Sequence, residues 1–105
     1  MNEQILSNIR ELKRKLLPND RLILFGSQAR GDAQPDSDWD LLILLDKKNK
    51  SSFSENYDNY GYPFAEIGDK FGAYLSVKVY NKNDWEKRSF TPFYENVMND
   101  GIEIK

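Results

Sequence analysis

The chain contains neither cysteine nor histidine among its 105 residues. Without cysteine it can form no disulfide, no thiolate metal site and no cysteine nucleophile. Without histidine it lacks the most common general base and the most common zinc ligand. Any metal ion that its side chains bind must therefore be held by oxygen atoms, which favours Mg²⁺ or Mn²⁺.

Long hydrophobic runs are also lacking. No segment approaches the roughly 20 apolar residues that a membrane span requires. The first residues, Met1 to Ile5, have neither the basic flank nor the apolar core of a secretory signal. We therefore expect a cytoplasmic protein with no membrane segment. The length predicts one domain, residues 1–105, which is large enough to fold around its own core.

An excess of positive charge is absent as well. Against 15 Lys and Arg there are 17 Asp and Glu, so the net charge of −2 gives no general attraction for a polyanion. Basic residues do cluster at 10–15 and at Lys47, Lys48 and Lys50, but no aromatic side chain is interleaved with them for stacking on bases. Nucleic acid is therefore not expected as the main ligand.

Four helical segments are predicted. An amphipathic helix is expected over residues 2–17, because its apolar residues lie on one helical stripe. Residues 53–71 carry aromatic and aliphatic side chains at helical spacing, after a capping box at 52–55. A short helix is expected over 81–88, capped by Asn81, and a further helix after Thr91, with proline at its first position. The residues of the first stripe are Ile5, Ile9, Leu12 and Leu16.

Glycine and proline define the ends of these helices. Gly61 to Pro63 interrupt the second segment, which predicts either a kink or two pieces, the second beginning near Pro63. Gly72 is expected to end that segment and Gly101 the last helix. The aromatic side chains of 53–71 and 90–94 are expected to be mostly core.

Strands are predicted at 21–25, 38–45 and 73–80, with a short edge strand at 102–104. In the third strand, alternation sets Leu75, Val77 and Val79 on an apolar core face and Tyr74, Ser76, Lys78 and Tyr80 on the other. Residues 46–51 are a charged connection. The order of elements predicts an α/β (α+β) domain, with a small mixed β-sheet of three to four strands and helices packed on it.

A glycine-serine turn follows the first strand. Gly26 would allow a ligand to approach the backbone, and the unpaired N–H groups at a helix start can receive a phosphate. Ser27 is predicted as the N-cap of a short helical turn that runs to Arg30 and ends at Gly31. The alternative for an isolated Gly-Ser pair is a capped turn with no ligand.

Two carboxylates open the second strand. Side chains alternate along a strand, so Asp38 and Asp40 are expected on the same face. Two such acids repel each other unless a cation or water lies close by. The alternative is a loop end in solvent, with Ser37 and Asp38 as turn residues. The pair therefore indicates either an oxygen-ligand metal site or an exposed turn.

The two motifs together resemble a known family. Gly26 and Ser27, ten further residues, and then Asp38 and Asp40 match the signature of the DNA polymerase β-like nucleotidyltransferases. The fuller string, Phe25 to Gly31 followed by Ser37 to Leu41, resembles the minimal nucleotidyltransferase subgroup. Looser similarity continues over 77–80, at Trp85 and over 92–102, so the resemblance spans essentially the whole chain and implies the polymerase β-like fold.

This resemblance implies roles for particular residues. Asp38 and Asp40 would be the catalytic carboxylates that bind Mg²⁺ or Mn²⁺. Gly26 and Ser27 would hold the β- and γ-phosphates of a nucleoside triphosphate, ATP in our interpretation. Arg30 and Ser37 would lie beside them as further nucleotide-binding residues.

One position departs from the family pattern. Family members usually place a third carboxylate on the third strand, facing the metal ions. Here the site-facing positions are predicted to be Ser76 and Lys78, neither of them acidic. Glu66, Asp69 or an acid of a partner chain remain open as substitutes.

The resemblance also implies an activity and a partner. A minimal nucleotidyltransferase of this kind would transfer AMP from ATP to a hydroxyl, a tyrosine in our interpretation, of a HEPN-domain protein, and would act as the antitoxin of that toxin. The alternative is a nucleotide-binding module, catalytically weak or inactive, that neutralises its partner by contact. A transferase acting on a small molecule is a third reading. The acceptor, the base specificity and the formation of an oligomer stay open.

Overall fold

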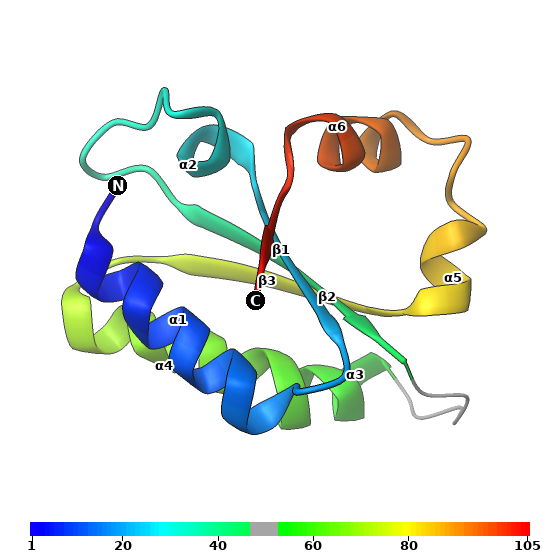
Figure 1. The fold of residues 1–105 in the computed structure, drawn as a ribbon, viewed down its shortest axis with the longest axis horizontal. Helices are drawn as coiled ribbons and strands as arrows, with labels where there is room; N and C mark the ends of the chain where they lie inside the picture. The colour runs from blue at the N-terminus through cyan, green and yellow to red at the C-terminus, as the bar shows by residue number, and fades with distance from the viewer. Residues whose placement is uncertain (47–52) are drawn as a thin grey trace.

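A mixed β-sheet is the centre of the fold in the computed structural model, which describes residues 1–46 and 53–105 (Figure 1). The strands stand in the order β3-β2-β1-β4; β1 is antiparallel to β2 and β4, and β2 is parallel to β3. The prediction of a small mixed sheet is confirmed, with four strands. They are β1 (Arg21–Phe25), β2 (Trp39–Leu45), β3 (Leu75–Asn81) and β4 (Ile102–Ile104).

Helices cover both faces of this sheet. Figure 1 shows α1 and α4 on one side and α2 and α6 on the other. The helical segments are α1 (Glu3–Leu16), α2 (Gly26–Arg30), α3 (Phe53–Asn56), the π-helix η1 (Tyr57–Gly61), α4 (Tyr62–Phe71), α5 (Lys82–Glu86) and α6 (Pro92–Asp100).

The alternation of strand side chains divides the core into two clusters. The larger cluster joins α1 and α4 to one face of the sheet, and Leu41, Ile43 and Phe64 are fully buried in it. The smaller cluster lies on the opposite face, where Leu42 and Trp85 of α5 are fully buried. Because successive residues of β2 enter opposite clusters, β2 is apolar along most of its length.

Several local predictions are confirmed. The helix expected over residues 2–17 is α1, and the side chain of Asn2, whose capping role was not predicted, accepts hydrogen bonds from the backbone N–H groups of Gln4 and Ile5 at 2.9 and 3.2 Å. Thr91 accepts one from the N–H of Tyr94 at 3.2 Å and begins α6. Strand β1 has its predicted bounds and β4 is the predicted edge strand.

The segment after residue 52 forms neither a simple kink nor two separated pieces. The chain remains helical, but a π-helical stretch joins α3 to α4, which starts at Tyr62 with Pro63 in its first turn. Proline is tolerated there because first-turn N–H groups have no partner within the helix. Ser52 of the predicted capping box and residues 47–51 of the charged connection lie outside the described residues.

One predicted cap is wrong, and a second is right in position only. Helix α2 begins at Gly26, so Ser27 lies inside the helix and is not its N-cap. Asn81 stands at the N-cap position of α5, but its side chain makes no capping hydrogen bond. Three aromatic side chains also depart from the expected core, since Phe53 is 69%, Tyr62 52% and Phe90 86% exposed.

Candidate functional site

Residues Phe25, Asp40 and Ser76 form one row across the sheet. In the antiparallel pair of β1 and β2, Phe25 is opposite Asp40, and in the parallel pair of β2 and β3, Asp40 is opposite Ser76. The end of β1 thus stands beside the start of β2, and the chain enters α2 directly at Gly26. This arrangement brings the glycine-serine turn and the second carboxylate together.

The side chain of Asp40 belongs to the face of the sheet that carries α5 and α6. Leu42, two residues on, packs in the cluster of that face, whereas Leu41 packs in the opposite one. Ser76 and Lys78 of β3 share the face of Asp40 through the parallel register. Ser76 and Lys78, the two third-strand positions expected to face the site, therefore lie on the same face of the sheet as Asp40.

Asp38 lies outside the strand in which we predicted it. The ladder begins at Trp39, whose backbone N–H donates to the Tyr74 carbonyl at 2.9 Å, and Asp38 is exposed in the preceding loop. The period-two argument for a common face therefore does not apply to it. The two acids are nevertheless close enough to interact, because the charge of Asp38 raises the pKa of Asp40.

The pKa of Asp40 lies above its ordinary value of 3.8. Partial burial is the main cause and the charge of Asp38 the second, while Lys78 and Arg30 act in the opposite direction. A carboxylate that is partly desolvated and next to another acid is stabilised in its ionised form by a cation. The oxygen atoms of Asp38 and Asp40 fit a divalent ion such as Mg²⁺, which takes one or two carboxylates together with phosphate oxygens.

Gly26 fits closely against Asp40. Its φ of 75° lies in the left-handed region, and a Cβ atom at this position would collide with Oδ2 of Asp40. Glycine is thus required both by the backbone conformation and by the neighbouring carboxylate.

Arg30 is held at the end of α2 by two acids. Its Nε lies 3.3 Å from Oδ2 of Asp32, and its Nη1 lies 3.6 Å from Oδ2 of Asp100 at the end of α6. Asp100 was not predicted as a site residue, because it lies 70 residues from Arg30 along the chain and no local sequence pattern indicates that the two side chains meet. Arg30 is near enough to lower the pKa of Asp40 while forming these pairs.

Ser37 closes the loop between α2 and β2. Its hydroxyl accepts a hydrogen bond from the backbone N–H of Gln34 at 2.8 Å, and its carbonyl accepts one from Nε2 of Gln28 at 3.3 Å. Gln28 is only 7% exposed and was also missed from the sequence, where a buried glutamine in a short helix has no signature. These contacts position the loop that delivers Asp38.

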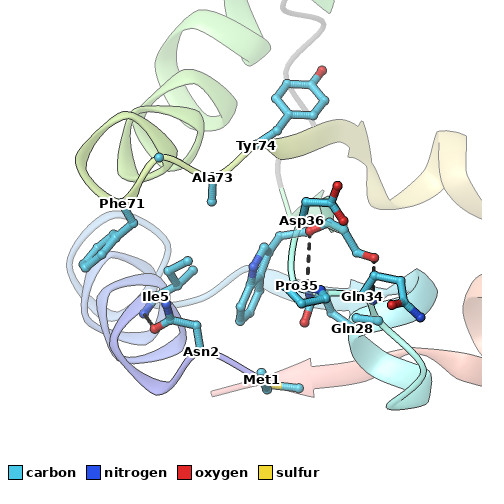
Figure 2. A pocket seen from close by; sticks show the side chains of 14 residues that line it. Met1, Asn2, Ile5, Gln28, Gln34, Pro35, Asp36, Phe71, Ala73 and Tyr74 are labelled. Atoms are coloured by element: carbon cyan, nitrogen blue, oxygen red, sulfur yellow. Dashed lines mark hydrogen bonds between the residues drawn. The ribbon is translucent and has the colours of Figure 1, made fainter.

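A cavity of about 590 Å³ lies beside this loop (Figure 2). It is open between the N-terminal residues, the loop and the turn after α4, and Trp39 contributes to its wall. Because Trp39 and Asp40 point to opposite faces of β2, the wall that Trp39 forms lies on the other face of the strand from the Asp40 side chain. Lining residues in Figure 2 include Met1, Asn2, Gln34, Asp36, Phe71 and Tyr74.

The described residues offer no third carboxylate. Among residues 1–46 and 53–105 there is no group of three or more acidic, histidine or cysteine side chains that could hold a metal ion. Glu66 and Asp69, which the sequence left open as substitutes, lie on α4, and α4 covers the opposite face of the sheet from Asp40. Neither can complete the site from there.

The fold and this pair of motifs define a nucleotidyltransferase. Residues 6–102 match the nucleotidyltransferase domain family, and the chain belongs to it. This confirms the family resemblance and the fold class expected from the sequence.

Two relatives come from Methanocaldococcus jannaschii. The chain is 35% identical over 97 residues to "Putative protein adenylyltransferase MJ0141", and the aligned region covers 89% of this chain and 83% of that protein. It is 32% identical over 83 residues to "Putative protein adenylyltransferase MJ1379", and the aligned region covers 72% of this chain and 83% of that protein.

Two solved structures share the fold. A toxin-antitoxin crystallised with AMP-PNP matches with a TM-score of 0.62 and 17% identity, over 95% of this chain and 72% of that one. A mutant of the MntA-HpeT toxin-antitoxin matches with a TM-score of 0.60 and 18% identity, over 100% of this chain and 72% of that one. At these identities the likeness concerns the fold alone.

Within the part of the chain that the structure describes, no helix has the length and apolar character needed to cross a membrane.

Proposed function

We propose that this nucleotidyltransferase transfers AMP from ATP to a hydroxyl group of a partner protein, with tyrosine as the acceptor and a HEPN-type toxin as the partner. The observation that carries the proposal is the juxtaposition of Asp38, Asp40 and Gly26 at the end of the sheet, in a chain of this family. The names of both relatives, each a "Putative protein adenylyltransferase", support AMP as the transferred group and a protein as the acceptor.

In this reaction the acceptor oxygen forms a bond to the α-phosphorus of ATP. The bond between the α-phosphorus and the bridging oxygen breaks, pyrophosphate leaves, and the acceptor hydroxyl loses its proton to solvent or to a nearby base. Asp38 and Asp40 would hold Mg²⁺, which supplies charge neutralisation and alignment for the phosphates. Gly26 and Ser27 would hold the terminal phosphates, with Arg30 and Ser37 beside them.

The fold that this chain shares with toxin-antitoxin proteins supports the role of antitoxin. The two solved structures described above are toxin-antitoxin proteins, and one was crystallised with AMP-PNP. A toxin partner is therefore the first candidate acceptor for this chain. The HEPN identity of that partner comes from the family resemblance of the sequence.

A second candidate function is neutralisation by contact, with nucleotide binding but no transfer. It is favoured by one observation, that the described residues supply two carboxylates and no third. In this case the partner would be inhibited without being modified.

The test is incubation of the full chain with α-labelled ATP, Mg²⁺ and the product of the neighbouring gene as the candidate toxin. We expect label on the toxin with the wild type and at least about a hundredfold less with Asp38→Asn or Asp40→Asn, because loss of a charged ligand removes several kcal/mol of transition-state stabilisation. Replacing the acceptor tyrosine, located by mass spectrometry, should also abolish labelling.

Asp69→Asn is the matched control, since it removes a carboxylate on α4, on the far side of the sheet. It should label the toxin as the wild type does. Toxin inhibition that persists in Asp40→Asn, with no label transferred by the wild type, would instead establish the contact module.

A further inference from the structure

Lys78 is a cation close enough to Asp40 to lower the pKa of that carboxyl, yet it has no ion-pair partner among the described residues. It stands on the same face as Asp40, two positions beyond Ser76 along β3, and its side chain is exposed. It forms no ion pair with any residue in the described ranges. Other lysines of the surface do form such pairs, for instance Lys15 with Glu11 at 3.0 Å and Lys82 with Asp46 at 3.9 Å.

The second cation of the site differs in this respect. Arg30 is already paired with Asp32 and Asp100. Its charge is therefore partly offset before any ligand arrives, and its guanidinium is held toward the end of α6. Lys78 is exposed and forms no ion pair within the described residues, so its ammonium group keeps three donors for a ligand.

The donor set limits how many metal ions the site can hold. Sites for two divalent ions clamp both the attacking and the leaving oxygen, and they need carboxylates for each ion. This chain offers Asp38 and Asp40, and its third-strand positions on that face are Ser76 and Lys78. A lysine next to the position of a second ion would repel that ion rather than bind it.

Lysine can do part of the work of such an ion. It is a common phosphate ligand that acts as a point charge, and a charge-assisted hydrogen bond to phosphate is about twice as strong as a neutral one. Because Gly26 lies against Asp40, a triphosphate held at Gly26 and Ser27 would approach the face that Lys78 shares with Asp40.

We propose that Lys78 binds the triphosphate directly and replaces a second metal ion, so that the site takes one divalent ion per nucleotide. The inference rests on the proposed function for the position of the nucleotide. It concerns binding, so it can be measured without turnover.

The first experiment counts metal ions. The full chain is titrated with Mn²⁺ in the presence of α,β-methylene-ATP, whose α–β linkage resists cleavage, and bound Mn²⁺ is followed by electron paramagnetic resonance. We expect one Mn²⁺ per chain in the wild type and two in Lys78→Glu, which supplies a third carboxylate. Two ions in the wild type would overturn the proposal.

The second experiment measures nucleotide affinity by calorimetry with the same analogue at saturating Mn²⁺. Lys78→Met should weaken binding by about tenfold or more, because it removes a charge-assisted hydrogen bond and keeps the aliphatic stem. Lys78→Arg should retain most of the affinity. Lys15→Met, an exposed lysine of α1, is the control and should bind as the wild type does.

Unchanged affinity in Lys78→Met would overturn the proposal. Each variant is compared with the wild type by thermal unfolding, so that a loss of affinity is assigned to binding only when the variant is folded. If the wild type transfers AMP but Lys78→Met binds the nucleotide analogue as tightly as the wild type, this inference is refuted and the proposed function stands. If one Mn²⁺ binds per chain, nucleotide affinity depends on Lys78 and no AMP is transferred, the inference is supported and the transferase activity is refuted.

Discussion

Gly26 shows how a single residue can serve two constraints at once. Its positive φ lets the chain turn from β1 into α2 within one residue, and its missing side chain leaves room for the carboxylate of Asp40. The first constraint is local and the second comes from β2, 14 residues further along the chain. Gly31 ends the same helix with a φ of 80°, yet nothing lies within 4 Å of its Cβ position.

This contrast gives a matched pair of variants. Gly26→Ala and Gly31→Ala should each lose about 1–2 kcal/mol of unfolding free energy, because alanine is strained in the left-handed region. Gly26→Ala alone should also weaken binding of Mn²⁺ with α,β-methylene-ATP, by about tenfold or more, since the methyl group displaces Asp40. Urea denaturation and calorimetry measure the two effects. Equal nucleotide affinity in both variants would show that the contact has no role in binding.

At the scale of elements, the helical segment from Phe53 to Phe71 is held in place by its π-helical part. Gly61 ends η1 and packs against β3: a Cβ atom there would lie 2.8 Å from Cδ2 of Tyr57 and 3.0 Å from Cγ2 of Val79. The absence of a side chain allows this close approach of helix and strand. A π-helical turn moves the following residues around the helix axis, so α4 presents Phe64 to the larger cluster.

Gly61→Ala is therefore expected to destabilise the protein. In an uncrowded helix this substitution gains up to about 1 kcal/mol of helix propensity. Here we expect a net loss of about 1–2 kcal/mol, because an added methyl group overpacks the contact with Tyr57 and Val79. The measurement is urea denaturation, and a stabilised variant would contradict it. The double variant with Val79→Ala should lose less unfolding free energy than the two single variants lose together, since the smaller side chain at position 79 relieves the crowding.

At the scale of the whole molecule, two carboxyl groups have opposite effects on the pH dependence of stability. The pKa of Glu103 on β4 is lowered, mainly by its hydrogen bonds with Arg21, the shortest of them 2.7 Å long. This interaction stabilises the fold above the unfolded pKa and is lost as the pH falls through the lowered folded pKa. The pKa of Asp40 is raised, so its ionised form costs stability at pH values above that folded pKa.

Two substitutions should separate these contributions in the metal-free protein. Glu103→Gln should lose about 1 kcal/mol or less near pH 7, as expected of a half-exposed ion pair, and the loss should shrink below the ordinary pKa of 4.5. Asp40→Asn should gain stability near pH 7, and the gain should vanish as the pH falls below 3.8. Urea denaturation from pH 3 to about pH 8 measures both. A loss of stability in Asp40→Asn at pH 7 would contradict the assigned cost of its charge.

The sequence predicted what depends on near neighbours. Strand β1, the cap of α6 by Thr91 and the ends of helices at Gly31 and Gly72 follow from patterns a few residues long. The spacing of Gly26 and Ser27 from Asp38 and Asp40 indicated the family, which the match over residues 6–102 confirms. Ser27 was misassigned as a capping residue, and Asn81 holds the N-cap position of α5 without a capping hydrogen bond. Propensity does not say where a helix begins or where a side chain finds its partner.

Only the tertiary structure decided how these parts meet. Strand pairing set Asp40 opposite Ser76, with Lys78 on the same face, and packing set Gly26 against Asp40 and Arg30 against Asp100. The physical reason is distance along the chain. Local patterns determine the conformation of a few consecutive residues, whereas the register of a sheet and the contacts between its layers depend on burying apolar surface over the whole molecule.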